Sequence, residues 1–126
     1  MNENEIAQQI IAAALHIHRT FGPGLFEHVY EKILVYELNK HGLEVKRQMA
    51  IPVIYEGIQM EKIGYRADLI VEGKVLVELK SVETLSPVHF KQVLTYIRLA
   101  NIRLGLLINF NEEILLKGVK RIANKL

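Results

Sequence analysis

Cysteine is absent from all 126 residues of the sequence. Disulfide bonds, thiolate nucleophiles, zinc fingers and iron–sulfur clusters are therefore excluded. Any metal ion must be held by oxygen or imidazole, so carboxylates become the ligands to look for. The histidines show no metal-ligand spacing that would favour them over the carboxylates: His16, His18, His28, His41 and His89.

The sequence also lacks a long apolar run. The run near its start, residues 10–15, is far too short to span a bilayer. Residues 1–9 have acidic rather than basic character, unlike a secretory leader. We therefore expect a soluble, cytoplasmic protein without a membrane partner.

A large excess of one charge is missing as well. Sixteen basic and 14 acidic residues give a net charge of +2, which offers no general attraction to polyanions. Two interpretations of the basic C-terminal segment remain open, a solvated tail or a phosphate-contacting surface; its basic residues are Lys117, Lys120, Arg121 and Lys125. A hydrophobic content of 50% in 126 residues is enough for one packed core, so we expect a single domain over residues 1–126.

Two helices are predicted at the start of the chain. Apolar residues between Ile6 and Ile17 recur at intervals of three and four, which indicates an amphipathic helix over residues 4–20. The segment 21–24, Phe-Gly-Pro-Gly, interrupts this pattern. A second helical pattern follows over residues 25–41, with Gly42 placed to cap its C-terminus.

A sheet follows the two helices. Runs rich in β-branched residues and leucine, separated by the turn residues 56–57 and 72–74, predict a three-stranded antiparallel meander over residues 43–55, 58–71 and 75–82. Proline at the first position favours a helix over residues 87–101. An apolar strand is expected over residues 103–110. The remaining residues predict a short strand or a terminal helix, of which we favour the strand.

This order predicts an α/β fold. The helix over residues 87–101 would cross over and bring the strand at 103–110 beside the meander, giving a mixed β-sheet flanked by helices.

The hairpin around the turn 72–74 carries the chemistry. Residues two apart in a strand share a face, so Glu78 and Lys80 project together. A three-residue turn would place Asp68 on that same face, while the apolar residues of both strands occupy the other face. The cross-strand pairs expected from this register are Val71 with Val75, Leu69 with Val77, Ala67 with Leu79, and Asp68 with Glu78.

Two facing carboxylates at positions 68 and 78 repel each other, a cost of up to about 1 kcal/mol for a cross-strand pair. A divalent cation between Asp68 and Glu78 would remove this cost, with both carboxylates acting as hard oxygen ligands. The alternative is that both lie in water at the sheet margin, with Lys80 as a simple ion partner. Because residues 75–80 are mostly apolar, where unpaired charges are costly, we favour the metal site.

An aspartate followed by Glu-x-Lys on the next strand resembles the signature of the PD-(D/E)XK nucleases. The segment 24–30, Gly-Leu-Phe-Glu-His-Val-Tyr, also fits the Gly-x-x-Glu-x-x-Tyr signature of the GxxExxY proteins within that superfamily. The resemblance extends from about Ile10 to Asn124. It departs from the pattern at Ala67, which stands where the superfamily often has proline.

The resemblance implies a restriction-endonuclease-like core and a nuclease that uses Mg²⁺, or Mn²⁺, to hydrolyse phosphodiester bonds in DNA. By the same resemblance, Glu27, Asp68 and Glu78 bind the metal together with the backbone carbonyl of Leu79. Lys80 would orient the attacking water and help to deprotonate it.

A second element on the helix over residues 87–101 resembles the Gln-x-x-x-Tyr motif of RecB-like members. It places Gln92 at the catalytic site and Tyr96 either beside the substrate or in the core.

Three further residues have open interpretations. Tyr30 either holds a ligand carboxylate near the substrate or packs, Glu31 is a solvated charge or a group behind the ligands, and Arg66 contacts phosphate or pairs with a carboxylate.

Two other functions compete with the nuclease. The first is a catalytically inactive module that binds nucleic acid or a protein partner. The second is a structural partner in a larger complex, for which an exposed apolar patch on the first helix would be the clue. A homodimer is also expected, since small domains with a single site often dimerise to address two strands.

Overall fold

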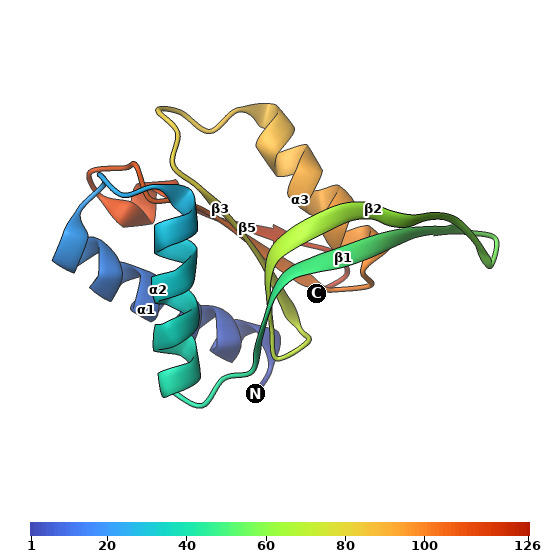
Figure 1. The fold of residues 1–126 in the computed structure, drawn as a ribbon, viewed down its shortest axis with the longest axis horizontal. Coiled ribbons are helices and arrows are strands. Elements are labelled where there is room, and N and C mark those ends of the chain that lie inside the picture. The colour runs from blue at the N-terminus through green and yellow to red at the C-terminus, as the bar shows by residue number, and fades with distance from the viewer.

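A computed structural model describes the backbone of residues 1–126 and every side chain except that of Ile63. Figure 1 shows the chain as a twisted sheet with helices on both faces. The elements are α1 (Glu3–Phe21), α2 (Glu27–Lys40), β1 (Val45–Tyr55), β2 (Ile58–Val71), β3 (Val75–Lys80), α3 (Pro87–Leu99), β4 (Leu104–Asn109), a short 3₁₀ helix (Leu115–Gly118) and β5 (Val119–Ala123). The expected order is confirmed, and the last element is the favoured strand.

The helix ends follow from their local sequence. The side chain of Asn2 accepts a hydrogen bond from the Glu5 amide, while the Glu5 side chain accepts one from the Asn2 amide, which forms a capping box at α1. After α2, Gly42 adopts a positive φ of 83°, and the Leu43 amide donates to the Leu38 carbonyl at 3.0 Å. This Schellman motif uses the glycine that was expected to end the helix.

The sheet has the strand order β1-β2-β3-β4-β5. The β1–β2 and β2–β3 pairs are antiparallel, β3 and β4 are parallel, and β5 is antiparallel to β4. Helix α3 connects the two parallel strands, which confirms the predicted crossover. All six residues of β4 are buried, as expected for a central strand covered on both faces.

Two apolar clusters pack against the two faces of the sheet. Helices α1 and α2 cover one face, where Leu69 and Val77 belong to the larger cluster. Helix α3 covers the other face, where Val93 packs with Leu76. Gly105 allows this close approach, because a Cβ atom there would lie 2.6 Å from Cγ1 of Val93.

The β2–β3 hairpin has the predicted register near its turn but not beyond it. Val71 pairs with Val75 and Leu69 with Val77. The ladder then ends, so the expected backbone pairs of Asp68 with Glu78 and of Ala67 with Leu79 are wrong. Ala67 also packs in the α3 cluster rather than with Leu69.

None of the described helices combines the length and the hydropathy that a bilayer crossing requires.

Candidate active site

The two strands of the hairpin separate where the carboxylates stand. The Asp68 amide donates to Oε1 of Glu78 at 2.9 Å, and the Leu79 amide donates to Oδ2 of Asp68 at 2.8 Å. Each carboxylate thus satisfies a backbone N–H that would otherwise need a ladder partner. Asp68 and Glu78 therefore meet in the gap between β2 and β3 rather than as a regular cross-strand pair.

Burial changes the ionisation of this pair. Glu78 is only 4% exposed. Desolvation, with the nearby Asp68 charge as the next cause, raises the pKa of Glu78 to about 8. Desolvation also raises the pKa of Asp68, although its hydrogen bond from Leu79 opposes the shift. Near neutral pH the pair accordingly retains a proton.

Lys80 lies at the end of β3, two residues after Glu78, and is half-buried. Its positive charge acts to lower the pKa values of both Asp68 and Glu78. Among the described side chains, however, its ammonium forms no ion pair within 4.0 Å. The amine is thus close enough to affect the pKa of both carboxyl groups, although it forms an ion pair with neither of them.

Helix α2 adds a third carboxylate. Glu27 is the first residue of α2, is exposed, and accepts a hydrogen bond from the Ser81 amide at 3.2 Å. A cleft of about 190 Å³ brings it together with the hairpin; the lining residues are Glu27, His28, Glu31, Gln48, Asp68 and Leu79. Glu27 therefore opens onto the same space as Asp68.

The family comparison agrees with this geometry. The model of the PD-(D/E)XK nuclease superfamily matches residues 4–122. The chain belongs to the PD-(D/E)XK nuclease superfamily. Neither the comparison with curated proteins nor that with solved structures finds a match. The fold, a mixed sheet flanked by helices, is consistent with the restriction-endonuclease-like core of this superfamily.

A PD-(D/E)XK site has to hold its carboxylates in place. Here Glu31 of α2 and Arg47 and Gln48 of β1 contribute to holding Asp68. Glu31 is buried and binds Arg47 at 2.7 Å through Oε2 and the amide of Gln48 at 2.7 Å through Oε1. The Gln48 amide also donates to Oδ1 of Asp68 at 3.3 Å. Glu31 is therefore not a solvated charge. We call the contacts among Arg47, Glu31, Gln48 and Asp68 the acid relay.

Sequence reasoning missed Arg47 and Gln48 altogether. Only one signal in the sequence, the position of Glu31 one helical turn after Glu27, pointed to the relay. Gln48 adopts a positive φ of 50°, an uncommon conformation for a residue other than glycine. No local pattern indicates this conformation, because it arises where β1 bends beside Asp68.

Asn109 is another missed residue, in a strand that was expected to be mostly apolar. It is fully buried, and its side chain accepts from the Val82 amide at 3.1 Å and donates to the Val82 carbonyl at 2.9 Å. Asn109 is also the cross-strand neighbour of Lys80. It therefore fixes the segment that leaves β3 just after the lysine.

The glutamine and tyrosine of α3 lie together on the Glu78 side of the sheet. The Gln92 amide donates to the Tyr96 hydroxyl at 2.8 Å. Tyr96 is largely buried and stacks obliquely on Tyr65, with ring centroids 5.4 Å apart. Burial, followed by the Glu78 charge, raises the pKa of Tyr96. Tyr96 is thus a core residue whose hydroxyl is near the carboxyl pair, while Gln92 is half-buried beside it.

Tyr30 and Arg66 occupy very different places. Tyr30 is fully buried, stacks on Phe110, and uses its hydroxyl to bind the Gly22 carbonyl and the Leu25 amide. It therefore packs and holds the loop before α2, and it presents no surface to a substrate. Arg66 is exposed and donates to the Gln48 carbonyl at 3.3 Å, next to the acid relay.

The donor set suits a hard divalent cation. Asp68, Glu78 and Glu27 supply carboxylate oxygens at one end of the sheet, which are the ligands Mg²⁺ and Mn²⁺ prefer. Among the described residues, however, no three acidic or histidine side chains are already gathered around one point. An ion would have to draw these carboxylates closer together.

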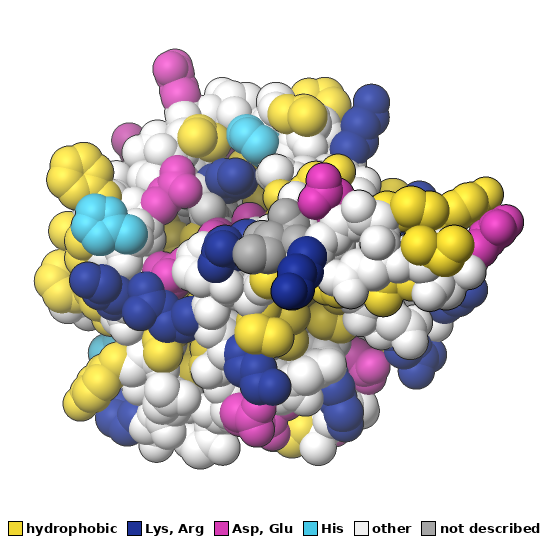
Figure 2. Space-filling view, turned by 45° about the vertical axis from the view of Figure 1, so that its right-hand side comes forward, with side chains coloured by type: hydrophobic (Ala, Val, Ile, Leu, Met, Phe, Trp, Pro, Cys, Tyr) yellow, Lys and Arg dark blue, Asp and Glu magenta, His cyan; other side chains and the backbone are white. Residues whose placement is uncertain are grey.

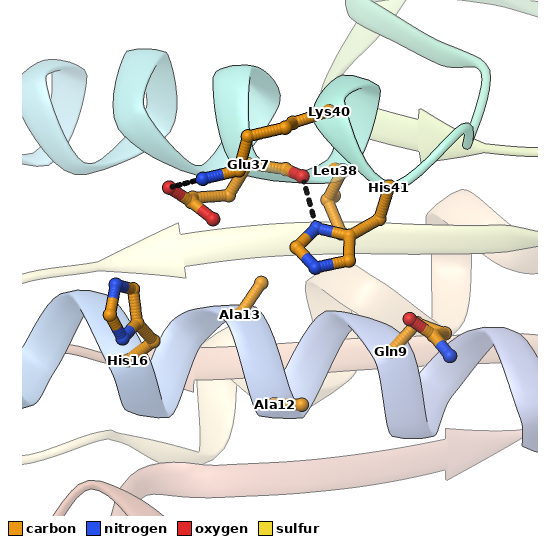
Figure 3. A pocket seen from close by; sticks show the side chains of 8 residues that line it. All are labelled: Gln9, Ala12, Ala13, His16, Glu37, Leu38, Lys40 and His41. Carbon is orange, nitrogen blue, oxygen red and sulfur yellow. Dashed lines mark hydrogen bonds and ion pairs between the residues drawn. The ribbon is translucent and has the colours of Figure 1, made fainter.

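A larger hollow between α1 and α2 does not offer an alternative metal site. Its volume is about 340 Å³, and Figure 3 shows His16 and His41 well apart along its rim. His41 is bonded to the Glu37 carbonyl at 2.8 Å, and the Glu37 carboxylate is paired with Lys40 at 3.1 Å. The two imidazoles therefore have no free carboxylate in this hollow to share a metal with.

Proposed function

We propose that this protein is a nuclease that cleaves phosphodiester bonds in DNA and requires a divalent cation, Mg²⁺ or Mn²⁺. One observation carries the proposal: two carboxyl groups, of buried Glu78 and half-buried Asp68, meet where the hairpin ladder stops, beside a Lys80 amine that forms no ion pair with the described side chains. A purely structural site would not favour burying two acids together, because each must be desolvated against the charge of the other.

Asp68, Glu78 and Glu27 would hold the cation, together with the Leu79 carbonyl. When bound, such a cation lowers the pKa of water and neutralises the charge that grows on the phosphate. Lys80 would orient the attacking water and help to deprotonate it, while Gln92 would act at the catalytic site and Arg66 would contact phosphate. Membership of the GxxExxY group, suggested by residues 24–30, fits the placement of Glu27 at the mouth of the cleft.

A cleavage assay tests this proposal directly. The purified protein is incubated with labelled linear, circular and branched DNA and with RNA, each with Mg²⁺, Mn²⁺ or EDTA. We expect cleavage of DNA with either cation and none with EDTA. Cleavage that persists in EDTA would exclude the proposed site.

A non-catalytic module that binds nucleic acid is the second candidate. It is favoured by the absence of a ready-made group of three ligands among the described residues. The same assay separates the two candidates when DNA binding is measured in parallel. Binding without cleavage under every metal condition would select the second candidate.

A further inference from the structure

One exposed aromatic side chain lies beside the candidate active site and has no role in the mechanism given above. Phe26 is the residue before α2, and it is 75% exposed, although phenylalanine is among the residues most often buried. The ring of His28 stacks on it, with ring centroids 5.8 Å apart and planes 12° from parallel. Because His28 partly covers one face of the Phe26 ring, the large exposed fraction means that the other face is open to solvent.

We propose that Phe26 and His28 stack on an unpaired base of the DNA substrate, next to the phosphodiester bond that is cleaved. This inference rests on the proposed nuclease function and adds a substrate class to it: single-stranded DNA, or DNA with an unpaired nucleotide at the cleavage position. Every base has a flat π face, and stacking on aromatic side chains is a common way in which proteins bind bases outside a duplex.

The aromatic pair borders the candidate active site. A hollow of about 410 Å³ is lined by Leu25, Phe26, Glu27, His28 and Ser81. This volume falls within the range of pockets that bind small ligands, about 300–1,000 Å³. Glu27 and His28 also line the smaller cleft that contains Asp68, so the two hollows adjoin each other. A DNA strand whose phosphate reaches the carboxylates would therefore pass the aromatic pair with a neighbouring base.

The backbone next to Phe26 is held in place by contacts with distant segments. The Leu25 amide donates to the Tyr30 hydroxyl at 3.0 Å, and the Ser81 hydroxyl donates to the Leu25 carbonyl at 3.4 Å. Ser81 directly follows Lys80, and Figure 1 shows the start of α2 beside the segment that leaves β3. The ring is thus presented by an anchored backbone, and a base can stack on it without the cost of ordering a loop.

A regular duplex would not use this aromatic surface. Neighbouring bases cover both faces of each base in a duplex, so only an unpaired or flipped base can stack on a side chain. Duplex binding relies instead on lysine and arginine contacts to phosphates. Figure 2 shows lysine and arginine side chains interspersed with acidic ones on the face it presents, and the net charge of the chain is only +2. Stacking would therefore supply affinity that the overall charge does not.

A tryptophan at position 26 would report stacking directly, because the chain contains no tryptophan of its own. In EDTA, which prevents cleavage, a single-stranded DNA oligonucleotide should quench the fluorescence of Phe26→Trp until binding saturates. The same oligonucleotide annealed to its complement should quench it much less. Tyr36→Trp is the matched control, since Tyr36 is 65% exposed on α2 but does not line either hollow. Its fluorescence should not change with either form of DNA.

Fluorescence anisotropy of labelled oligonucleotides measures how much the ring contributes to affinity. Phe26→Ala should weaken the binding of single-stranded DNA about tenfold or more, as for other contacts between a base and an aromatic ring. It should leave duplex binding nearly unchanged. The Phe26 side chain is mostly exposed and makes no capping hydrogen bond, so the variant should keep the melting temperature of the wild type. Tyr36→Ala should bind both forms of DNA as the wild type does.

Several results would overturn the stacking proposal. One is unquenched Phe26→Trp at oligonucleotide concentrations at which anisotropy shows binding. Equal losses of affinity in Phe26→Ala and Tyr36→Ala would overturn it too, as would binding of duplex as tight and as dependent on Phe26 as that of single strands, or no binding of DNA at all. The nuclease proposal fails by a different result, the absence of metal-dependent cleavage, which these binding measurements do not use.

Discussion

The β2–β3 hairpin differs sharply between its turn end and its open end, although the same two strands form both. At the turn end, apolar side chains cover a regular backbone ladder through Leu69 and Val77. At the open end the ladder stops, and the carboxylates of Asp68 and Glu78 replace the missing carbonyl partners. The comparison shows that this site is formed where backbone pairing is interrupted, so that acidic groups can occupy the gap.

The largest effect should come from removing a carboxylate at the open end. Asp68→Asn should lower the rate of metal-dependent cleavage at least about 10³-fold, since it removes charge that holds the cation and stabilises the transition state. Lys80→Ala should have a similar effect, and neither variant should lower the melting temperature substantially. The measurement is single-turnover cleavage of labelled DNA.

Glu72→Gln is the control for this prediction. Glu72 belongs to the turn of the same hairpin, where its carboxylate accepts a hydrogen bond from the Glu44 amide at 2.8 Å. Loss of that charge should leave the cleavage rate unchanged. Full activity in both Asp68→Asn and Lys80→Ala would contradict the proposed active site.

A substitution at the turn end should instead change the free energy of unfolding. Leu69 is fully buried in the cluster beneath α1 and α2. Leu69→Ala should lower the free energy of unfolding by about 2–5 kcal/mol, as for other buried leucines. Urea unfolding followed by circular dichroism measures this change. A loss below about 1 kcal/mol would mean that the regular ladder, rather than apolar packing, stabilises this end.

The acid relay should affect the metal affinity of the open end, because it holds Asp68 in place. Glu31→Gln removes the charge that Arg47 binds and weakens the support of Asp68 through Gln48. We expect a tenfold to hundredfold loss of Mn²⁺ affinity, the usual effect of residues that hold metal ligands in place. Isothermal titration calorimetry measures that affinity.

The same helix offers the control. Glu37→Gln breaks the ion pair with Lys40, which lies beside the hollow between α1 and α2 and away from the acid relay. Its Mn²⁺ affinity should equal that of the wild type. Equal losses in both variants would indicate a general effect on α2 rather than a role of the relay.

The smallest predicted effect is the pH dependence of stability in EDTA. The pKa of Glu78 is about 8 in the folded chain and 4.5 in its ordinary state, so the folded state binds the proton more tightly. Stability is therefore highest below pH 4.5 with respect to this group and falls as the pH rises towards 8. The fall should amount to at least about 1 kcal/mol, since one pKa unit is worth slightly more than that and Glu78 shares its shift with Asp68.

Glu78→Gln should flatten this part of the stability profile, as measured by urea unfolding at a series of pH values. Mg²⁺ should also raise the stability of the wild type at pH 8 but not that of the variant. A wild-type profile that rises over this range would show that the carboxyl of Glu78 is not desolvated.

Much of the fold was predictable because its signals are local. Helical spacing, the Gly42 cap and the turn at 72–74 act over a few residues, and each predicted element is present. The alternation in β3 also placed Glu78 and Lys80 on one face correctly. The pairing of Asp68 with Glu78 was predicted wrongly, because a regular ladder was extrapolated into the region where β1 bends and the strands separate.

The sequence alone determined which groups are available: oxygen ligands without thiolates, an acid in each strand of one hairpin, and an amine two residues after the second acid. Only the tertiary structure decided that Glu78 is buried and that Gln48 and Arg47 reach Glu31. The physical reason is that desolvation and contacts between distant segments depend on how the elements pack. The spacing of residues along the chain determines only which face of its own helix or strand each side chain occupies.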